Sequence, residues 1–204
     1  MSRQGFGRWL TLITLTQACS ISLCCFGPLT PARGQIIRDR TLGAESSVIV
    51  PDVNIRGIPS DQIEGGAIRG TSLFHSFTEF NIREGRGAYF TNPAGIENIL
   101  SRVTGTNPSN ILGTLGVLGN ANLFLINPNG IVFGPKAKLD VGGSFVASTS
   151  STVRLVDGTE FSATNPSAFP LLTVSIPVGL QYRGNEGSIQ VQGGAEFSAF
   201  CSQW

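Results

Sequence analysis

The sequence is poor in cysteine, histidine and charge. Its 204 residues include four cysteines, one histidine and 13% charged residues, against roughly a quarter charged in ordinary globular domains. Such a chain offers no cysteine–histidine set for a zinc ion. Neither a glycine-rich phosphate loop nor a Gly-x-Ser-x-Gly nucleophile elbow occurs in it. The sequence therefore predicts no metal, no cofactor and no enzymatic activity.

A sustained helical period is also missing after residue 34. The 26 glycines and 11 prolines predict frequent turns, and the 41% of hydrophobic residues exclude disorder. Short apolar or alternating runs lie between the turns, which is typical of an all-β domain. The predicted strands are Ser47–Val50, Val53–Ile58, Gly66–Phe77, Glu79–Ile82, Gly87–Thr91, Asn98–Val103, Asn122–Ile126, Ile131–Phe133, Leu139–Val141, Ser144–Ala147, Thr152–Val156, Leu171–Ile176 and Ser188–Gln192. Only Asn110–Leu118 leaves room for a helical turn.

Residues 1–34 have the layout of a secretory signal peptide. Arg3 and Arg8 form a basic start, and the stretch from Trp9 to Phe26 carries no charge. Small residues at Ala32 and Gly34 suit a cleavage site. A membrane anchor is the alternative, but this stretch contains several Thr and Ser and falls short of the roughly 20 apolar residues of a span. We expect cleavage before residue 35.

Cleavage there would change both the charge and the cysteine content. The loss of three arginines lowers the basic residues from 14 to 11 against 13 acidic ones, a net charge of −2. No basic patch remains, so no nucleic-acid partner is predicted. Cys201 would be the only remaining cysteine, so the mature chain could form no internal disulfide. That is unusual for a small exported domain. Either the core is large enough without cross-links, or a cross-link would hinder a later step such as passage through an outer-membrane pore in an unfolded state.

One short unit occurs twice in the sequence, at residues 91–96 and, 35 residues later, at residues 126–131. Each copy begins its turn with Asn-Pro, and proline, asparagine and glycine suit the second, third and fourth positions of a type I turn. Because an apolar run precedes each copy, we interpret them as turns on successive coils of a solenoid. The pattern favours a parallel β-helix. A β-sandwich of antiparallel hairpins is the alternative.

The segment Asn122–Gly134 resembles the signature of the filamentous haemagglutinin N-terminal domain. This is the secretion domain of two-partner systems, also called the haemagglutination activity domain. Further blocks that resemble the family are Leu73–Asn81, Asn98–Gly105, Gly142–Ser148 and Leu171–Leu180. The resemblance covers Gln35 to Gln192, almost the whole predicted mature chain.

The resemblance implies a fold, a partner and a set of motif residues. The fold is a right-handed single-stranded parallel β-helix of the pectin-lyase type, with an N-terminal cap and extra-helical strands. The partner is an outer-membrane β-barrel transporter whose POTRA domains recognise the chain in the periplasm, so the product would be secreted or held at the cell surface of a Gram-negative-type cell. The motif residues for secretion or structure are Asn127, Pro128, Asn129, Gly130, Ile131, Asn92, Pro93 and Gly95. Many members have Asn-Pro-Asn-Leu at the earlier copy, where this chain has Ala94 and Gly95.

The role of the motif asparagines has two interpretations. They can hydrogen-bond at β-helix turns or form ladders, or they can contact the transporter directly, and we favour the first. The domain organisation that we expect is a signal peptide at 1–34, the secretion domain at 35–192, and a divergent tail at 193–204 typical of a truncated copy. Long family members are adhesins, cytolysins or toxins, and repeats after this domain would bind a host or cell-surface carbohydrate or protein.

Two other functions compete with the cargo interpretation. One is a stand-alone module that binds carbohydrate or a surface. The other is a β-helical polysaccharide-degrading enzyme, which needs carboxylates close together, whereas Asp39, Asp52, Asp61 and Glu79 are scattered along the sequence. The sole histidine, His75, lies in an apolar run and is predicted to be packed in the core.

Overall fold

The structure is a computed structural model that describes residues 36–166 and 176–197. In these two ranges the chain forms β-strands joined by turns, with one short 3-10 helix, η1 (Gly43–Glu45), and no α-helix. No helix in the same ranges is long and apolar enough to cross a membrane. The predicted signal peptide, most of the predicted strand Leu171–Ile176 and the end of the predicted tail lie outside the described residues.

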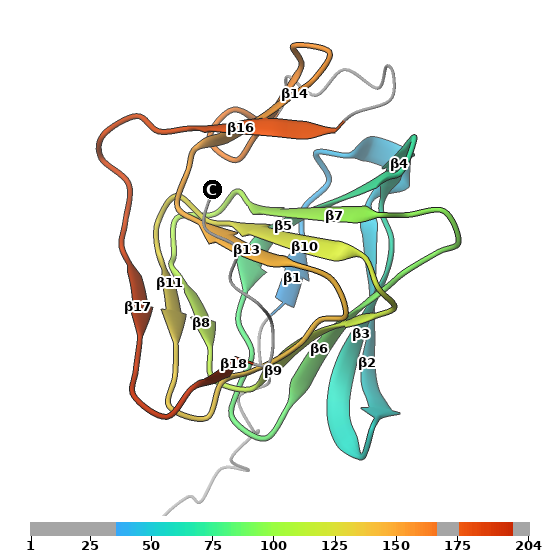
Figure 1. The fold of residues 1–204 in the computed structure, drawn as a ribbon, viewed down its shortest axis with the longest axis vertical. Helices are drawn as coiled ribbons and strands as arrows, with labels where there is room; N and C mark the ends of the chain where they lie inside the picture. Colours follow the sequence, from blue (N-terminus) through green and yellow to red (C-terminus); the bar gives the residue numbers. More distant parts are fainter. Residues whose placement is uncertain (1–35, 167–175, 198–204) are drawn as a thin grey trace, which may run out of the picture. The chain divides into compact units, whose positions relative to one another are not determined.

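Three sheets form the walls of a β-helix (Figure 1). Sheet A contains, side by side and parallel, β5 (Ser72–Phe80), β7 (Asn98–Val103), β10 (Asn122–Ile126) and β13 (Phe145–Ser148). Sheet B contains β3 (Ile58–Gly65), β6 (Gly87–Thr91), β9 (Thr114–Leu118), β12 (Lys138–Asp140) and β18 (Glu196–Phe197). Sheet C contains β8 (Ser109–Ile111), β11 (Ile131–Phe133) and β17 (Ile189–Val191). The chain visits B, A and C in turn on each coil.

Antiparallel elements cap and decorate the coils. β1 (Ile36–Arg38) and β4 (Ala67–Arg69) pair with β5, and β2 (Ser47–Ile55) forms a hairpin with β3. Between β13 and β17 the chain leaves the coils and forms sheet D from β14 (Thr152–Leu155), β15 (Glu160–Ser162) and β16 (Pro177–Gln181). The prediction of a parallel β-helix with a cap and extra-helical strands is confirmed, and the β-sandwich alternative is wrong.

Two apolar cores result from the alternation of side chains along sheet A. Inward residues such as Phe77, Ile99 and Leu123 fill the inside of the coils. Outward residues such as Phe74 and Leu100 form a second core with Val153, Leu155 and Phe161 of sheet D. Sheet D therefore covers the outer face of sheet A, and the two faces of these strands are both buried.

The two copies of the repeated unit lie on successive coils, as predicted, but at different corners. Gly87 pairs with Thr114 and Thr114 with Lys138, so one coil is shorter than the 35-residue offset. The first unit follows β6 and joins sheet B to sheet A, whereas the second follows β10 and joins sheet A to sheet C. The two units are turns at different corners, separated by one coil and one further wall.

Several predicted strand limits are also wrong. Pro51 lies within β2 at a register shift between Val50 and Val53, where a bulge removes the need for its missing N–H. The predicted strand Val53–Ile58 is interrupted at Arg56 and Gly57, a two-residue hairpin turn in which both residues have positive φ. The Asn110–Leu118 region forms parts of β8 and β9 rather than a helical turn.

Candidate functional site

The second motif copy forms the corner between β10 and β11. The backbone N–H of Gly130 donates to the carbonyl of Asn127 at 3.1 Å, which closes a four-residue turn with proline second, asparagine third and glycine fourth, as the sequence predicts. Gly130 has φ of 120°, a conformation that a residue with a Cβ rarely adopts. Ile131, the first residue of β11, is fully buried in the main core.

The Asn127 side chain connects this corner to the preceding coil. It is completely buried, and its Nδ2 donates to the carbonyl of Asn107 and to Ser109 Oγ, both at 3.0 Å. Its Oδ1 accepts from the backbone N–H of Asn129 at 3.0 Å and from Asn129 Nδ2 at 3.1 Å. Both N–H donors and the carbonyl oxygen of this amide are therefore satisfied within the protein.

The first motif copy forms a different turn between β6 and β7. Here the N–H of Ile96 donates to the carbonyl of Pro93 at 3.2 Å, so Gly95, with φ of 82°, occupies the third position. In the orientation of the Asn92 amide that satisfies both ends, its oxygen accepts from the N–H groups of Asn120 and Ala121, both at 3.2 Å. Asn92 therefore connects its corner to the following coil.

Two motif asparagines at different corners each connect one coil to its neighbour. Asn127 contacts the preceding coil, and Asn92 contacts the following coil.

The Asn129 side chain is exposed, and its Nδ2 donates to the carbonyl of Gly105 at 2.8 Å. Pro93 and Gly95 are also exposed, and Pro128 is half-buried. A ladder of amides at Asn98 and Asn122, 3.0 Å apart, adds a further contact between coils.

The two motif glycines should respond unequally to substitution by alanine. A Cβ at Gly95 has nothing within 4 Å, so Gly95→Ala should cost about 1 kcal/mol of unfolding free energy, from the left-handed backbone alone. A Cβ at Gly130 would meet the carbonyl oxygen of Ser188 at 3.0 Å, and we expect a loss of about 2 kcal/mol for Gly130→Ala. Urea unfolding of both variants measures this difference, and equal losses would contradict it.

A buried arginine that the sequence did not single out lies on the outer face of sheet A. Arg102 is fully buried, and its Nε donates to Ser76 Oγ at 2.8 Å while its Nη1 donates to the carbonyl of Ser162 at 2.7 Å. Its guanidinium carbon lies 4.3 Å from the centre of the Phe161 ring. Burial lowers the pKa of Arg102 to about 10, and attraction to Asp39 opposes that shift. The side chain therefore stays charged at neutral pH.

The carboxylate of Asp39 balances this cation through intervening hydroxyls. Thr41 and Ser76 each donate from their hydroxyl to Asp39 at 2.7 Å, and so does Thr104. Partial burial raises the pKa of Asp39, but hydrogen bonds from Thr104, Thr41 and Ser76 outweigh that effect and lower it overall. The signal that could have found this pair is a single arginine within the otherwise uncharged strand β7.

His75 is packed in the main core, as predicted. It is fully buried, its Nδ1 lies 2.9 Å from Ser47 Oγ, and its ring lies 5.1 Å from that of Phe90. Its Nε2 has no hydrogen-bond partner. Because burial disfavours the charged imidazolium, the pKa of His75 falls to about 3.

Two carboxylates that seemed scattered in the sequence share one arginine. Asp52 Oδ1 and Asp61 Oδ1 each lie 2.9 Å from Arg86 Nη2. The single guanidinium therefore binds both carboxylates, and the three side chains form one ion-pair cluster. In the described part of the chain, no group of three or more His, Cys, Asp or Glu residues could hold a metal ion.

A stack of parallel coils with asparagine contacts between them defines a β-helical protein. Residues 34–197 match the TPS secretion domain family, and the chain belongs to this family of two-partner secretion domains. No solved structure matches the chain.

The chain is also similar in sequence to a curated protein. The chain is 32% identical over 136 residues to a heme/hemopexin-binding protein of Haemophilus influenzae. The match covers 66% of this chain and 14% of that protein. The chain therefore spans a small part of the length of its relative, and the similarity supports a two-partner-secreted exoprotein.

Proposed function

We propose that the chain is the secretion domain of an adhesin-like exoprotein and that POTRA domains of an outer-membrane transporter recognise it in the periplasm. Residues 1–34 direct Sec-dependent export and are then removed. The domain crosses the outer membrane unfolded and folds as a β-helix outside the cell. The observation that supports this proposal best is the pair of asparagine contacts, from Asn127 and Asn92, each of which joins one coil to the next.

The order of pairing favours folding during export. The strands β6, β7 and β9 to β13 each pair with a strand of the coil that precedes them in the sequence, and β8 makes an isolated bridge to it through Ile111 and Ile82. If the chain leaves the cell with its N-terminal end first, the coil that each new strand contacts is therefore already outside the cell. Each added coil buries apolar surface, at roughly 25 cal/mol per Å², which opposes backsliding.

We assign to the motif asparagines a structural role and not direct contact with the transporter. Asn127 is buried with its amide fully bonded, so the folded domain offers no surface there. Asn129 is exposed and is the motif asparagine that a partner could touch on the folded domain. These two residues therefore separate the two interpretations.

Export assays test the proposal. The full chain would be expressed with and without a two-partner transporter, and culture medium and periplasm would be assayed. We expect transporter-dependent appearance in the medium, little change for Asn129→Ala, and strongly reduced export for Asn127→Ala. Retention in the periplasm of a folded, protease-resistant wild-type product in every case would overturn the secretory function. A block in Asn129→Ala alone would instead indicate direct recognition.

The relative is named for heme and hemopexin, and we do not extend that binding to this domain. The only histidine of the chain, His75, is fully buried and bonded to Ser47. A groove of about 570 Å³ between sheets A and D is lined by uncharged residues, among them Phe124, Val146 and Leu180. We place adhesin-like binding in regions that follow this domain in longer members.

A further inference from the structure

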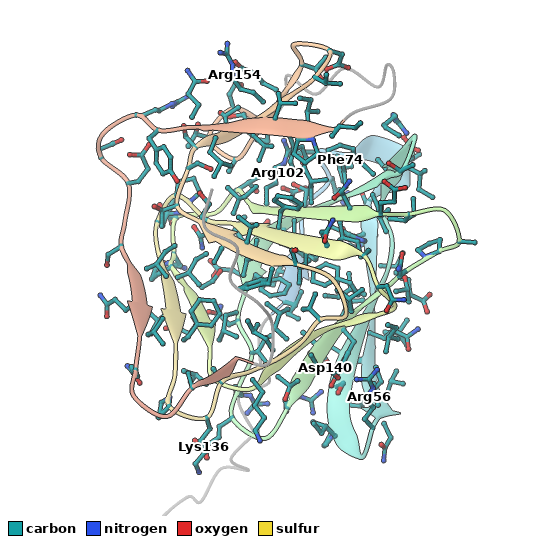
Figure 2. All side chains as sticks on the ribbon, in the orientation of Figure 1. Arg56, Phe74, Arg102, Lys136, Asp140 and Arg154 are labelled. Atoms are coloured by element: carbon teal, nitrogen blue, oxygen red, sulfur yellow. The ribbon has the colours of Figure 1, made fainter. Side chains whose placement is uncertain are left out.

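Arg102 lies where three separate parts of the chain meet. The N-terminal segment, residues 39–41, approaches it through Thr41, whose Oγ1 accepts from Arg102 Nη2 at 2.8 Å. Strand β5 approaches it through Ser76. The segment that runs through β15 approaches it through Phe161, Ser162 and Pro166. Figure 2 places Arg102 beside Phe74, on the side of sheet A that faces sheet D.

Half of the hydrogen-bond acceptors of Arg102 come from far downstream. The carbonyls of Ser162 and Pro166 lie 60 and 64 positions after it in the sequence, and the Phe161 ring belongs to the same segment. Until these residues have folded into place, the outer side of the guanidinium has no protein partner. Its burial is therefore completed only when sheet D docks.

The same guanidinium group holds the N-terminal segment. Nη2 donates both to Thr41 Oγ1 and to the carbonyl of Pro166. The Thr41 and Ser76 hydroxyls accept hydrogen bonds from Arg102 and donate hydrogen bonds to the Asp39 carboxylate. A buried cation is stable only when its donors are satisfied together, so loss of the downstream acceptors should also weaken the upstream ones.

We propose that Arg102 couples the docking of sheet D to the anchoring of residues 39–41, so that the two segments lock and unlock together. In a chain that folds from its N-terminal end, residues 39–41 can therefore still detach until the chain has folded through residue 166. This coupling is a property of the folded domain and does not depend on the secretory role.

A competing route between the same segments exists through apolar contacts. Leu42 belongs to the second core together with Val153 and Phe161, so sheet D could stabilise the N-terminal segment without Arg102. A thermodynamic cycle separates the two routes. It combines Phe161→Ala, which removes the ring over the cation, with Arg102→Met, which removes the cation and keeps an unbranched side chain.

Hydrogen–deuterium exchange of the full mature chain, followed by mass spectrometry, provides the readout. Peptides over 36–47 and over 152–162 report the two segments. We expect Phe161→Ala to raise exchange about tenfold or more in both peptides, as for one cooperative unit. In the Arg102→Met background the same substitution should no longer change exchange in 36–47.

A second arginine supplies the matched control. Arg154 lies on β14, its side chain is 61% exposed, and it projects away from the coils (Figure 2). Arg154→Met should leave exchange in 36–47 unchanged. Unchanged exchange of 36–47 in Phe161→Ala would overturn the coupling, and so would an equal effect of Phe161→Ala with and without Arg102. If Arg102→Met does not fold, Arg102→Lys serves instead, because an ammonium group cannot reach Ser76, Thr41 and Ser162 at once.

Discussion

Between pH 7 and pH 3 the domain should lose roughly 4 kcal/mol of unfolding free energy through His75 alone. The ordinary pKa of histidine, 6.5, applies to the unfolded chain, and the folded value is about 3. Below pH 6.5 the His75 imidazole is protonated in the unfolded chain but stays neutral in the folded chain, so acid favours unfolding. The loss begins near pH 6.5 and is complete once the pH falls through about 3.

The size of this effect follows from the place of His75 in the coils. The ring lies between β2 and the aromatic residues Phe77 and Phe90, and among the described residues Ser47 Oγ is its only hydrogen-bond partner. Burial is the only cause of the lowered pKa, so no neighbouring carboxylate compensates a charge there. Protonation would require the cap hairpin to open or the core to accept a cation.

His75→Phe isolates this contribution. Phenylalanine keeps an aromatic ring against Phe77 and Phe90 but cannot titrate. Urea unfolding at half-unit steps from pH 7 to pH 4 should show a steep fall in unfolding free energy for the wild type and a nearly flat profile for the variant. Parallel profiles would show that His75 does not carry the acid sensitivity. Asp39, whose pKa is lowered, adds a loss at still lower pH in both proteins.

The turns and the core strands could be predicted from sequence because they depend on local chemistry. Asn127 to Gly130 form the predicted turn because proline, asparagine and glycine each suit one backbone position. The β-helix itself followed from short apolar runs between such turns. The repeated unit correctly indicated successive coils. It did not indicate which corner each turn occupies, because one turn unit can serve any corner and spacing in the sequence does not say which wall a strand joins.

The contacts that complete the fold were beyond the reach of local patterns. Arg102 reads as one charged residue in an apolar strand, and its partners lie 26 residues before and 60 residues after it. Asp52 and Asp61 meet at Arg86 only because a hairpin with a bulge brings them together. The hydrogen bonds of the Asn127 side-chain amide depend on the register of β10 against β7, which no turn motif specifies.

Asn127→Ala should destabilise the domain by about 3 kcal/mol, because it leaves a buried site with several unsatisfied groups. The carbonyl of Asn107, Ser109 Oγ and the N–H of Asn129 would each lose a partner. Asn127→Asp keeps the shape but places an oxygen against the Asn107 carbonyl, so it should cost at least as much.

Asn129→Ala is the matched control for this prediction, since it removes an exposed amide that donates to the carbonyl of Gly105. Its cost should stay near 1 kcal/mol. Equilibrium urea unfolding of the mature chain measures all three variants. Equal losses for Asn127→Ala and Asn129→Ala would mean that the buried amide does not hold the coils together. A large gap, with export falling in proportion to stability, would mean that the motif acts through the fold.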